Sequence, residues 1–205
     1  MLALLAHPAG AQALTVEPLA VLHDLPRPAE ARHRLELRVV VLHEAWSHDE
    51  IQAAVHEAAR ILGQCGIHGS RVDLLRVNAP QAQRHFDPPQ SRQLARALDL
   101  PKPALFFTAG TRQLPAYDAV AYGRSNSRRS PELASTVWIA PGARDLGIVI
   151  AHELVHVLMD SGEHVATPGN LMAEDTTPGN TVLTAAQCGR ITDAGSRQGL
   201  LRGVD

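Results

Sequence analysis

Hydrophobic and polar positions alternate along much of the chain in patterns that predict both strands and helices. Residues 33–44 alternate and then become continuously apolar, which is typical of a strand with one buried end. Ser47 begins a capping box ahead of an apolar stripe with helical spacing, so a helix is predicted from there to Gly63 or Gly66. Short apolar runs predict further strands at 72–77, 104–108, 119–122 and 136–140.

Helices are predicted between and after these strands. Two prolines open a short helix that runs to Leu98, an apolar run beginning at Leu146 predicts a buried helix, and Thr184 caps a final helix. This order of elements predicts an α/β or α+β fold in which helices pack on a mixed, mostly parallel twisted sheet. Residues 33–205 are expected to form a single domain, preceded by an irregular arm at 14–32 that contains three prolines.

The buried helix contains the sequence HELVH at residues 152–156. On a helix, His152 and His156 lie one turn apart on the same face, a spacing at which two imidazoles share one zinc ion. Glu153 lies beside that face, where its carboxylate is placed to take a proton from a metal-activated water. The pattern therefore predicts a zinc site on this helix.

Composition and charge restrict the classes of function. The chain has 205 residues and is 45% hydrophobic, which is enough for one well-formed core. Its net charge of −2 argues against a nucleic-acid partner. No apolar run is long enough to cross a bilayer, so no membrane span is predicted. The sequence does not indicate an oligomeric state.

The N-terminal residues and the two cysteines bear on location. Residues 1–13 combine a short apolar run with a small-residue stretch that resembles a cleavage site. We interpret them as the remnant of a signal peptide, and an Ala-rich tail is the alternative. Cys65 and Cys188 fit an exported protein in which one disulfide closes a long loop, and two separate buried thiols are the alternative. Together these features favour a secreted or periplasmic protein.

The motif and the residues after it resemble the metzincin clan of zinc peptidases. Met172, in the sequence NLMA, resembles the methionine of the Met-turn that lies beneath the metal in that clan. The helix from Thr184 resembles the helix that follows this turn, and the sheet order before the motif is similar to the clan's N-terminal subdomain. The specific motifs are confined to residues 152–172.

The resemblance implies three histidine ligands, but the third is displaced in this chain. Met159 and Gly162 stand where the clan has a glycine and its third histidine. A helix that continues for three more residues leaves in nearly the same direction, about 4.5 Å further along its axis. His164, just beyond this extension, is therefore predicted to complete an open three-ligand site.

Two other residues compete with His164 as the third ligand. Glu174 would make the site resemble the gluzincins, and it ranks second because no helix is predicted around it. Asp160 lies about 12 Å along the helix axis from His152, so its short carboxylate does not easily meet an ion held between the two histidines. Asp160 is better interpreted as a polar residue at the end of the helix.

The resemblance also implies an activity, that of a zinc-dependent endopeptidase acting on peptide or protein substrates. One Zn²⁺ held by the three histidines would activate water, with Glu153 as general base and Met172 packed beneath the site. The short strand at 119–123 resembles the clan's edge strand, which binds extended peptides by strand addition. Two alternatives stay open: a zinc-dependent hydrolase of a non-peptide amide, and a non-catalytic metal-binding protein of the same fold. The presence of Glu153 argues against the second.

Overall fold

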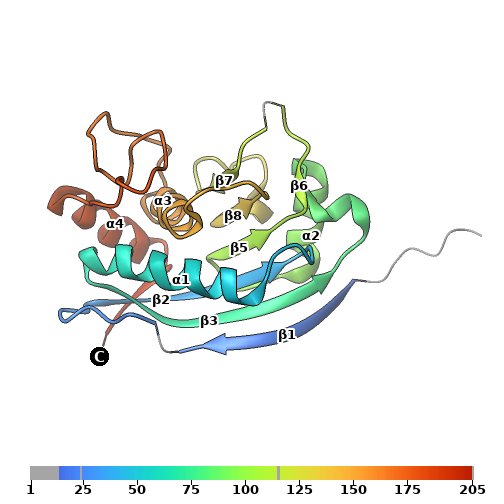
Figure 1. Ribbon diagram of the computed structural model, residues 1–205, viewed down its shortest axis with the longest axis horizontal. Coiled ribbons are helices and arrows are strands. Elements are labelled where there is room, and N and C mark those ends of the chain that lie inside the picture. The colour runs from blue at the N-terminus through green and yellow to red at the C-terminus, as the bar shows by residue number, and fades with distance from the viewer. Residues whose placement is uncertain (1–13, 24, 115, 205) are drawn as a thin grey trace, which may run out of the picture.

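A twisted β-sheet forms the centre of the molecule in the computed structural model, which describes residues 14–23, 25–114 and 116–204. Within these residues the sheet has seven strands, of which six follow the order β1-β3-β2-β5-β8-β7 (Figure 1). The seventh, β9, pairs with the start of β2, whereas β5 pairs with its end. The seven strands are β1 (Thr15–Leu22), β2 (His33–Val41), β3 (Ile67–Asn78), β5 (Ala104–Phe107), β7 (Ala119–Tyr122), β8 (Thr136–Ile139) and β9 (Leu201–Gly203). Two further short strands, β4 (His85–Phe86) and β6 (Gly110–Thr111), pair with each other.

The sheet is mixed, as the sequence pattern predicts. Its four central strands, β3, β2, β5 and β8, are parallel to one another. The strands β1, β7 and β9 pair antiparallel with β3, β8 and β2, respectively. The α/β class with helices packed on a mixed sheet is therefore confirmed.

Helices cover both faces of this sheet. The described residues form the α-helices α1 (His48–Leu62), α2 (Pro88–Leu98), α3 (Leu146–Met159) and α4 (Ala185–Arg197). They also form the 3-10 turns η1 (Gly63–Cys65), η2 (Gln81–Arg84) and η3 (Pro131–Leu133). Residues of α1, α3 and α4 share the larger hydrophobic core with one face of the sheet. Residues of α2 pack on the opposite face, over a smaller core that includes Phe106 and Trp138. Among the described helices, none is both long and apolar enough to cross a bilayer.

The prediction of an irregular arm at 14–32 is wrong for its first part, because Thr15–Leu22 forms β1. This strand is antiparallel to β3 and lies at the edge of the sheet, with a register shift between Pro18 and Ala20. Proline lacks a backbone N–H, and an edge strand is the position in a sheet where that loss is tolerated. Pro18 therefore marks an edge strand, whereas Pro26 and Pro28 lie in the irregular chain that follows it. The proposed signal-peptide remnant at 1–13 lies outside the described residues.

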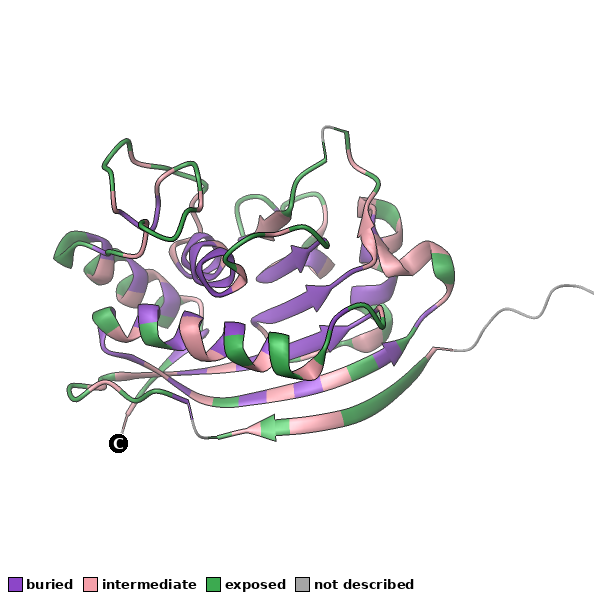
Figure 2. Cartoon of the chain, viewed as in Figure 1, coloured by how far each residue is buried: buried purple, intermediate pink, exposed green. Residues whose placement is uncertain are grey.

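Helix α3 lies in the middle of the helical layer and is buried along its length, whereas α1 and α4 each expose one side (Figure 2). Its close contact with α1 depends on Gly147, because a Cβ atom there would lie 2.5 Å from the Cβ of Glu57. The helix that carries the predicted motif is thus surrounded by protein on nearly all sides.

A disulfide joins Cys65, in η1 at the end of α1, to Cys188 in α4. The two residues are 123 positions apart, so the bond closes a loop that contains most of the domain. Such a cross-link stabilises the fold chiefly by restricting the unfolded chain.

Candidate metal centre

Two histidines of α3 face each other across one helical turn. The helix is apolar on almost every face, and eleven of its 14 residues are buried, including His152 and His156. Their Nε2 atoms lie 2.9 Å apart. Burial of two imidazoles in an apolar helix costs free energy unless their polar atoms find partners.

The third histidine comes from the segment that follows α3. Helix α3 ends at Met159, so the predicted extension of the helix toward Gly162 is wrong. Asp160 adopts the left-handed conformation (φ 50°), and the chain then turns back toward the motif. The Nε2 atom of His164 lies 3.2 Å from Nε2 of His152 and 3.2 Å from Nε2 of His156. The structure thus brings together the three histidines that the sequence analysis selected, and they form the candidate metal-binding group among the described residues.

Backbone carbonyls orient the two helical imidazoles. Nδ1 of His152 donates to the carbonyl oxygen of Leu171 at 2.7 Å, and Nδ1 of His156 donates to that of Ser161 at 2.7 Å. A carbonyl oxygen only accepts hydrogen bonds, so each Nδ1 carries the proton and each neutral ring presents a lone pair at Nε2. This is the arrangement by which outer partners orient metal-bound histidines.

The three Nε2 atoms fit a zinc ion. Lone pairs that converge within 3.2 Å repel one another unless a cation or a proton lies between them. Tetrahedral zinc with nitrogen ligands at about 2.0–2.1 Å places those nitrogens ~3.3 Å apart, close to the observed separations. A histidine-only set that leaves one position open is also the arrangement of catalytic rather than structural zinc.

Burial keeps these imidazoles in the form that binds metal. Desolvation lowers the pKa of His152, and it lowers the pKa of His156 to about 4, with a further lowering of the latter by the neighbouring His152. Hydrogen bonds from the rings to Leu171 and Ser161 oppose these shifts only in part. Both rings are therefore neutral at pH 7, as metal ligation requires.

Glu153 lies beside the three histidines on the wall of the same cavity. This cavity has a volume of about 450 Å³, and its lining includes the histidines, Glu153, Glu174 and residues 117–121 of β7 and the chain before it. Glu153 has no hydrogen-bond or ion-pair partner among the described residues. Desolvation raises the pKa of its carboxyl to about 7, although part of the side chain still faces the cavity. Such a carboxyl exchanges protons readily near neutral pH.

Met172 lies in a turn that also holds His152 in place. Its side chain is buried in the main core, and its backbone carbonyl accepts a hydrogen bond from the Val165 amide at 2.8 Å. The preceding carbonyl, that of Leu171, is the acceptor for His152. One short turn thus contacts both the residue directly after His164 and the first histidine of the motif.

A buried amide pair, which the sequence analysis did not select, supports this turn. Asn170 and Gln187 exchange two side-chain hydrogen bonds, at 2.9 and 3.0 Å, and the Asn170 oxygen also accepts from the Met172 amide at 2.9 Å. Gln187 belongs to the capping box of α4, where its side chain accepts from the Thr184 amide. The Thr-x-x-Gln spacing was a visible signal for Gln187, but nothing local in the sequence links it to Asn170.

The remaining candidates do not join the histidine cluster. Asp160 caps the C-terminus of α3, and its carboxylate accepts a hydrogen bond from the Ser125 amide at 2.6 Å, so it holds the loop after β7. Glu174 lines the cavity but is not part of the group of converging ligand atoms. Cys65 and Cys188 are bonded to each other and offer no thiolate.

Comparisons with known proteins bear on the fold. No protein-family model and no curated protein matches the sequence. Among solved structures, metalloproteinase-II from Bacteroides fragilis is similar, with a TM-score of 0.57 and 18% identity over 82% of this chain, which spans 54% of that protein's length. Archaemetzincin from Methanopyrus kandleri is similar with a TM-score of 0.51 and 11% identity over 80% of this chain and 97% of that one. The chain therefore has a metzincin-like metallopeptidase fold, which confirms at the level of the fold the resemblance drawn from its motifs.

Proposed function

We propose that this protein is a zinc-dependent metallopeptidase that hydrolyses peptide bonds. The observation that carries the proposal is the convergence of three histidine Nε2 atoms, two of them oriented by carbonyls, next to an unpaired carboxyl in one cavity. The likeness of the fold to two metalloproteinase-type structures supports it. We assign His152, His156 and His164 as the ligands of one Zn²⁺.

Each residue of the site has a defined task in this proposal. When bound, Zn²⁺ supplies Lewis-acid polarisation of a carbonyl and lowers the pKa of water. Glu153 acts as the general base: its carboxylate accepts a proton from the attacking water and then passes it to the leaving amine. Met172 packs beneath the histidines and keeps the turn that contacts His152 in place.

The strand β7 is proposed to bind the substrate. It is the last strand of the sheet order, so one of its edges has no strand partner among the described residues. Ala119, Val120 and Ala121 of this strand line the cavity of the histidines. An extended peptide that pairs with the free edge would pass the metal site, which is the geometry of an endopeptidase.

The disulfide between Cys65 and Cys188 supports a location outside the cytosol, because such bonds persist in oxidising compartments. We therefore propose a secreted or periplasmic protein.

Metal analysis of matched variants tests the ligand assignment. We expect one zinc per chain in the wild type, retained in Glu174→Ala and lost or much weakened in His164→Ala. Glu174→Ala is the matched control, because it removes a side chain of the same cavity that lies outside the histidine group. Undiminished zinc in His164→Ala would rule out the three-histidine site, and loss of zinc in Glu174→Ala would identify a glutamate ligand instead.

The catalytic assignment requires a second variant. Glu153→Gln preserves the size of the side chain and should retain zinc while lowering the rate of peptide cleavage by about 10²–10⁴-fold. Equal cleavage by Glu153→Gln and wild type would contradict the role of Glu153. Zinc binding without cleavage of any peptide library would favour one of the two alternatives, a non-peptide amide substrate or a metal-binding role without turnover.

A further inference from the structure

A second cavity lies on the other face of the sheet from α1, α3 and α4, and basic side chains line it. Its volume is about 180 Å³, and its wall is formed by the start of β2, the segment before β5 and the start of β9. The charged residues on this wall are Arg34, Glu36, Arg38, Lys102 and Arg202. Four cations thus surround a small space in a chain whose net charge is −2.

Two of these cations are opposite each other across a strand pair. In the antiparallel pairing of β2 with β9, Leu35 is the partner of Leu201, and both leucines are buried in the main core. Side chains alternate along a strand, so their neighbours Arg34 and Arg202 point to the other face. These two arginines are themselves direct partners in the register. Like charges in this position repel each other and destabilise the pairing.

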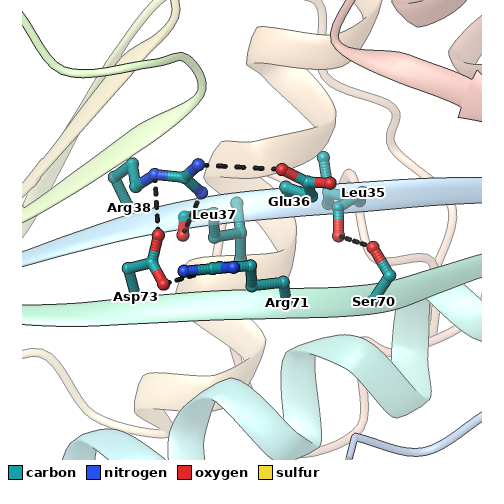
Figure 3. Close-up of polar contacts among 7 residues, drawn as sticks. All are labelled: Leu35, Glu36, Leu37, Arg38, Ser70, Arg71 and Asp73. Atoms are coloured by element: carbon teal, nitrogen blue, oxygen red, sulfur yellow. Dashed lines mark hydrogen bonds and ion pairs between the residues drawn. The ribbon is translucent and has the colours of Figure 1, made fainter. Parts of the chain in front are cut away.

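Arg38, by contrast, is already neutralised by its neighbours (Figure 3). Its guanidinium contacts Asp73 at 3.0 Å and Glu36 at 3.6 Å, and Asp73 also pairs with Arg71 at 2.8 Å. Two arginines and two carboxylates therefore balance one another beside the cavity. None of these carboxylates pairs with Arg34 or Arg202, which form no ion pair with any described residue.

The other cations of the cavity lack adequate acceptors. The Nε atom of Arg34 is buried and has no hydrogen-bond partner among the described residues. The ammonium group of Lys102 has a single long hydrogen bond, at 3.4 Å, to the carbonyl oxygen of Glu132. Burial lowers the pKa of Lys102 to about 8, with only a partial opposing effect from Asp99. A buried guanidinium nitrogen without an acceptor is costly, and it calls for a compensating partner.

We propose that this cavity binds a tetrahedral oxyanion, a phosphate or sulfate group, between Arg34, Arg202 and Lys102. The anion would separate the two opposed guanidinium groups, accept the orphan Nε–H of Arg34, and offer further oxygens to the Lys102 ammonium. Planar guanidinium groups are suited to such bidentate recognition. The site is built on the opposite face of the sheet from the histidine cluster, so it is independent of the proposed peptidase activity.

Calorimetric titration of the full chain with sodium sulfate and with sodium phosphate, at constant ionic strength, tests this site. We expect saturable binding of one anion per chain. Arg202→Gln, a substitution of an exposed residue, should weaken binding at least about ten-fold. The control Arg129→Gln removes the same charge from an exposed loop residue outside the cavity and should leave the affinity within about two-fold. Arg34→Gln should act like Arg202→Gln.

Thermal unfolding distinguishes anion binding at this site from a general effect of salt on stability. Sulfate and phosphate stabilise most proteins by exclusion from their surface. A specific site predicts that the anion-dependent rise in Tm is smaller in Arg202→Gln than in Arg129→Gln. It also predicts that Arg202→Gln has a Tm in chloride no lower than that of the wild type, because the substitution removes a like-charge contact.

Two outcomes would overturn the proposal: absence of saturable binding in the wild type, or equal affinities in Arg202→Gln and Arg129→Gln.

Titration with phenyl phosphate distinguishes a free phosphate ion from a phosphate group carried on a larger molecule. Binding of phenyl phosphate as tight as that of inorganic phosphate would support a site for a phosphate carried on a larger molecule. Binding of the inorganic anion alone would support a site for the free ion.

Discussion

Helix α3 and the segment that follows it hold the same cluster of histidines by different physical means. In α3 the positions of His152 and His156 follow from a regular helix that is buried on nearly all sides. Between α3 and α4 the described backbone forms one isolated bridge, Asn170 with Val182, and otherwise depends on individual hydrogen bonds, while a few side chains such as Leu171 and Met172 reach the main core. A regular buried helix places two of the candidate ligands, and an irregular segment held largely by polar contacts places the third.

This difference predicts whether a substitution should mainly change the stability of the domain or the geometry of the site. Loss of apolar contacts on α3 should reduce the stability of the whole domain and leave the geometry of the site largely intact. Loss of a hydrogen bond in the following segment should cost less stability but move the turn that contacts His152. Variants of α3 should therefore change mainly the free energy of unfolding, and variants of the following segment should change mainly the zinc affinity.

The largest expected effect is on stability, from Leu154→Ala in α3. Leu154 is fully buried in the main core, so the substitution should lower the free energy of unfolding by about 3 kcal/mol. Urea unfolding measures this change, and zinc affinity of the folded protein should stay within about three-fold of the wild type. A large loss of zinc affinity in Leu154→Ala would show that packing and ligand geometry are not separable in this helix.

Asn170→Ala should show the opposite balance. The substitution leaves the Met172 amide and the Gln187 side chain without their partner, at a cost of about 2 kcal/mol. Because the same turn presents the carbonyl that orients His152, zinc affinity should fall about 10–100-fold. The matched control is Asn180→Ala in the same segment, whose side chain bonds Gly169 and Asp175 outside the buried pair and should affect zinc far less.

The pH dependence of the stability of the metal-free protein tests the opposite effects of two residues within α3. The unfolded chain protonates His156 near pH 6.5 and the native chain only near 4, so this residue lowers stability as the pH falls through that window. Native Glu153 keeps its proton up to about pH 7 whereas the unfolded carboxyl loses it near 4.5, so this residue lowers stability as the pH rises. His152, whose pKa burial also lowers, acts in the same direction as His156, and Glu153 opposes both. The chelated wild type should therefore lose less stability on acidification from pH 6.5 to 4.5 than the two histidines alone would cause.

Single substitutions should reveal each effect. In Glu153→Gln, the free energy of unfolding of the chelated protein should fall on acidification from pH 6.5 to 4.5 by on the order of 1–2 kcal/mol. In His156→Ala, stability should instead fall as the pH rises over the same interval. Denaturant unfolding at a series of pH values measures both slopes, and identical slopes in the two variants would contradict the opposing assignments.

The smallest effect is expected at Asp160, where the two regions meet. Asp160→Ala removes the acceptor of the Ser125 amide and places alanine in a left-handed conformation, which should cost about 1 kcal/mol. Asp160→Asn retains an acceptor and tolerates that conformation, so it should be nearly neutral. Neither should change the zinc content, and loss of zinc in both would return Asp160 to the list of candidate ligands.

The sequence pattern predicted the elements of the main core well and the edges of the fold poorly. Continuous apolar runs identified β2, β5 and β8, because buried parallel strands need apolar residues on both faces. At the edge, β1 was missed because Pro18 and the two prolines that follow the strand suggested an irregular segment, although an edge strand forms a ladder on one side only and tolerates proline. The strand β3 begins at Ile67, five residues before the predicted start at 72, where Gly69 and Ser70 interrupt the apolar pattern.

The candidate site likewise has a part that the sequence predicts and a part that it does not. The spacing of His152, Glu153 and His156 is a local property, because 3.6 residues per turn of any helix place them on adjoining faces. The amide pair of Asn170 and Gln187 joins residues 17 positions apart, and no local periodicity encodes it. His164 was selected on the expectation that the motif helix continues to Gly162, which is wrong, because α3 ends at Met159. The 3.2 Å approach of its Nε2 atom to His152 comes instead from the folding back of the segment after the helix.

From the amino-acid sequence alone, the class of the fold, the motif helix and its two histidines could be read, because hydrophobic periodicity and helical geometry act over short distances along the chain. Only the tertiary structure decided how β1 pairs, that Cys65 meets Cys188, and where Arg34 and Arg202 face each other. These contacts join residues far apart in sequence, and the free energy that selects them comes from the packing of the whole domain.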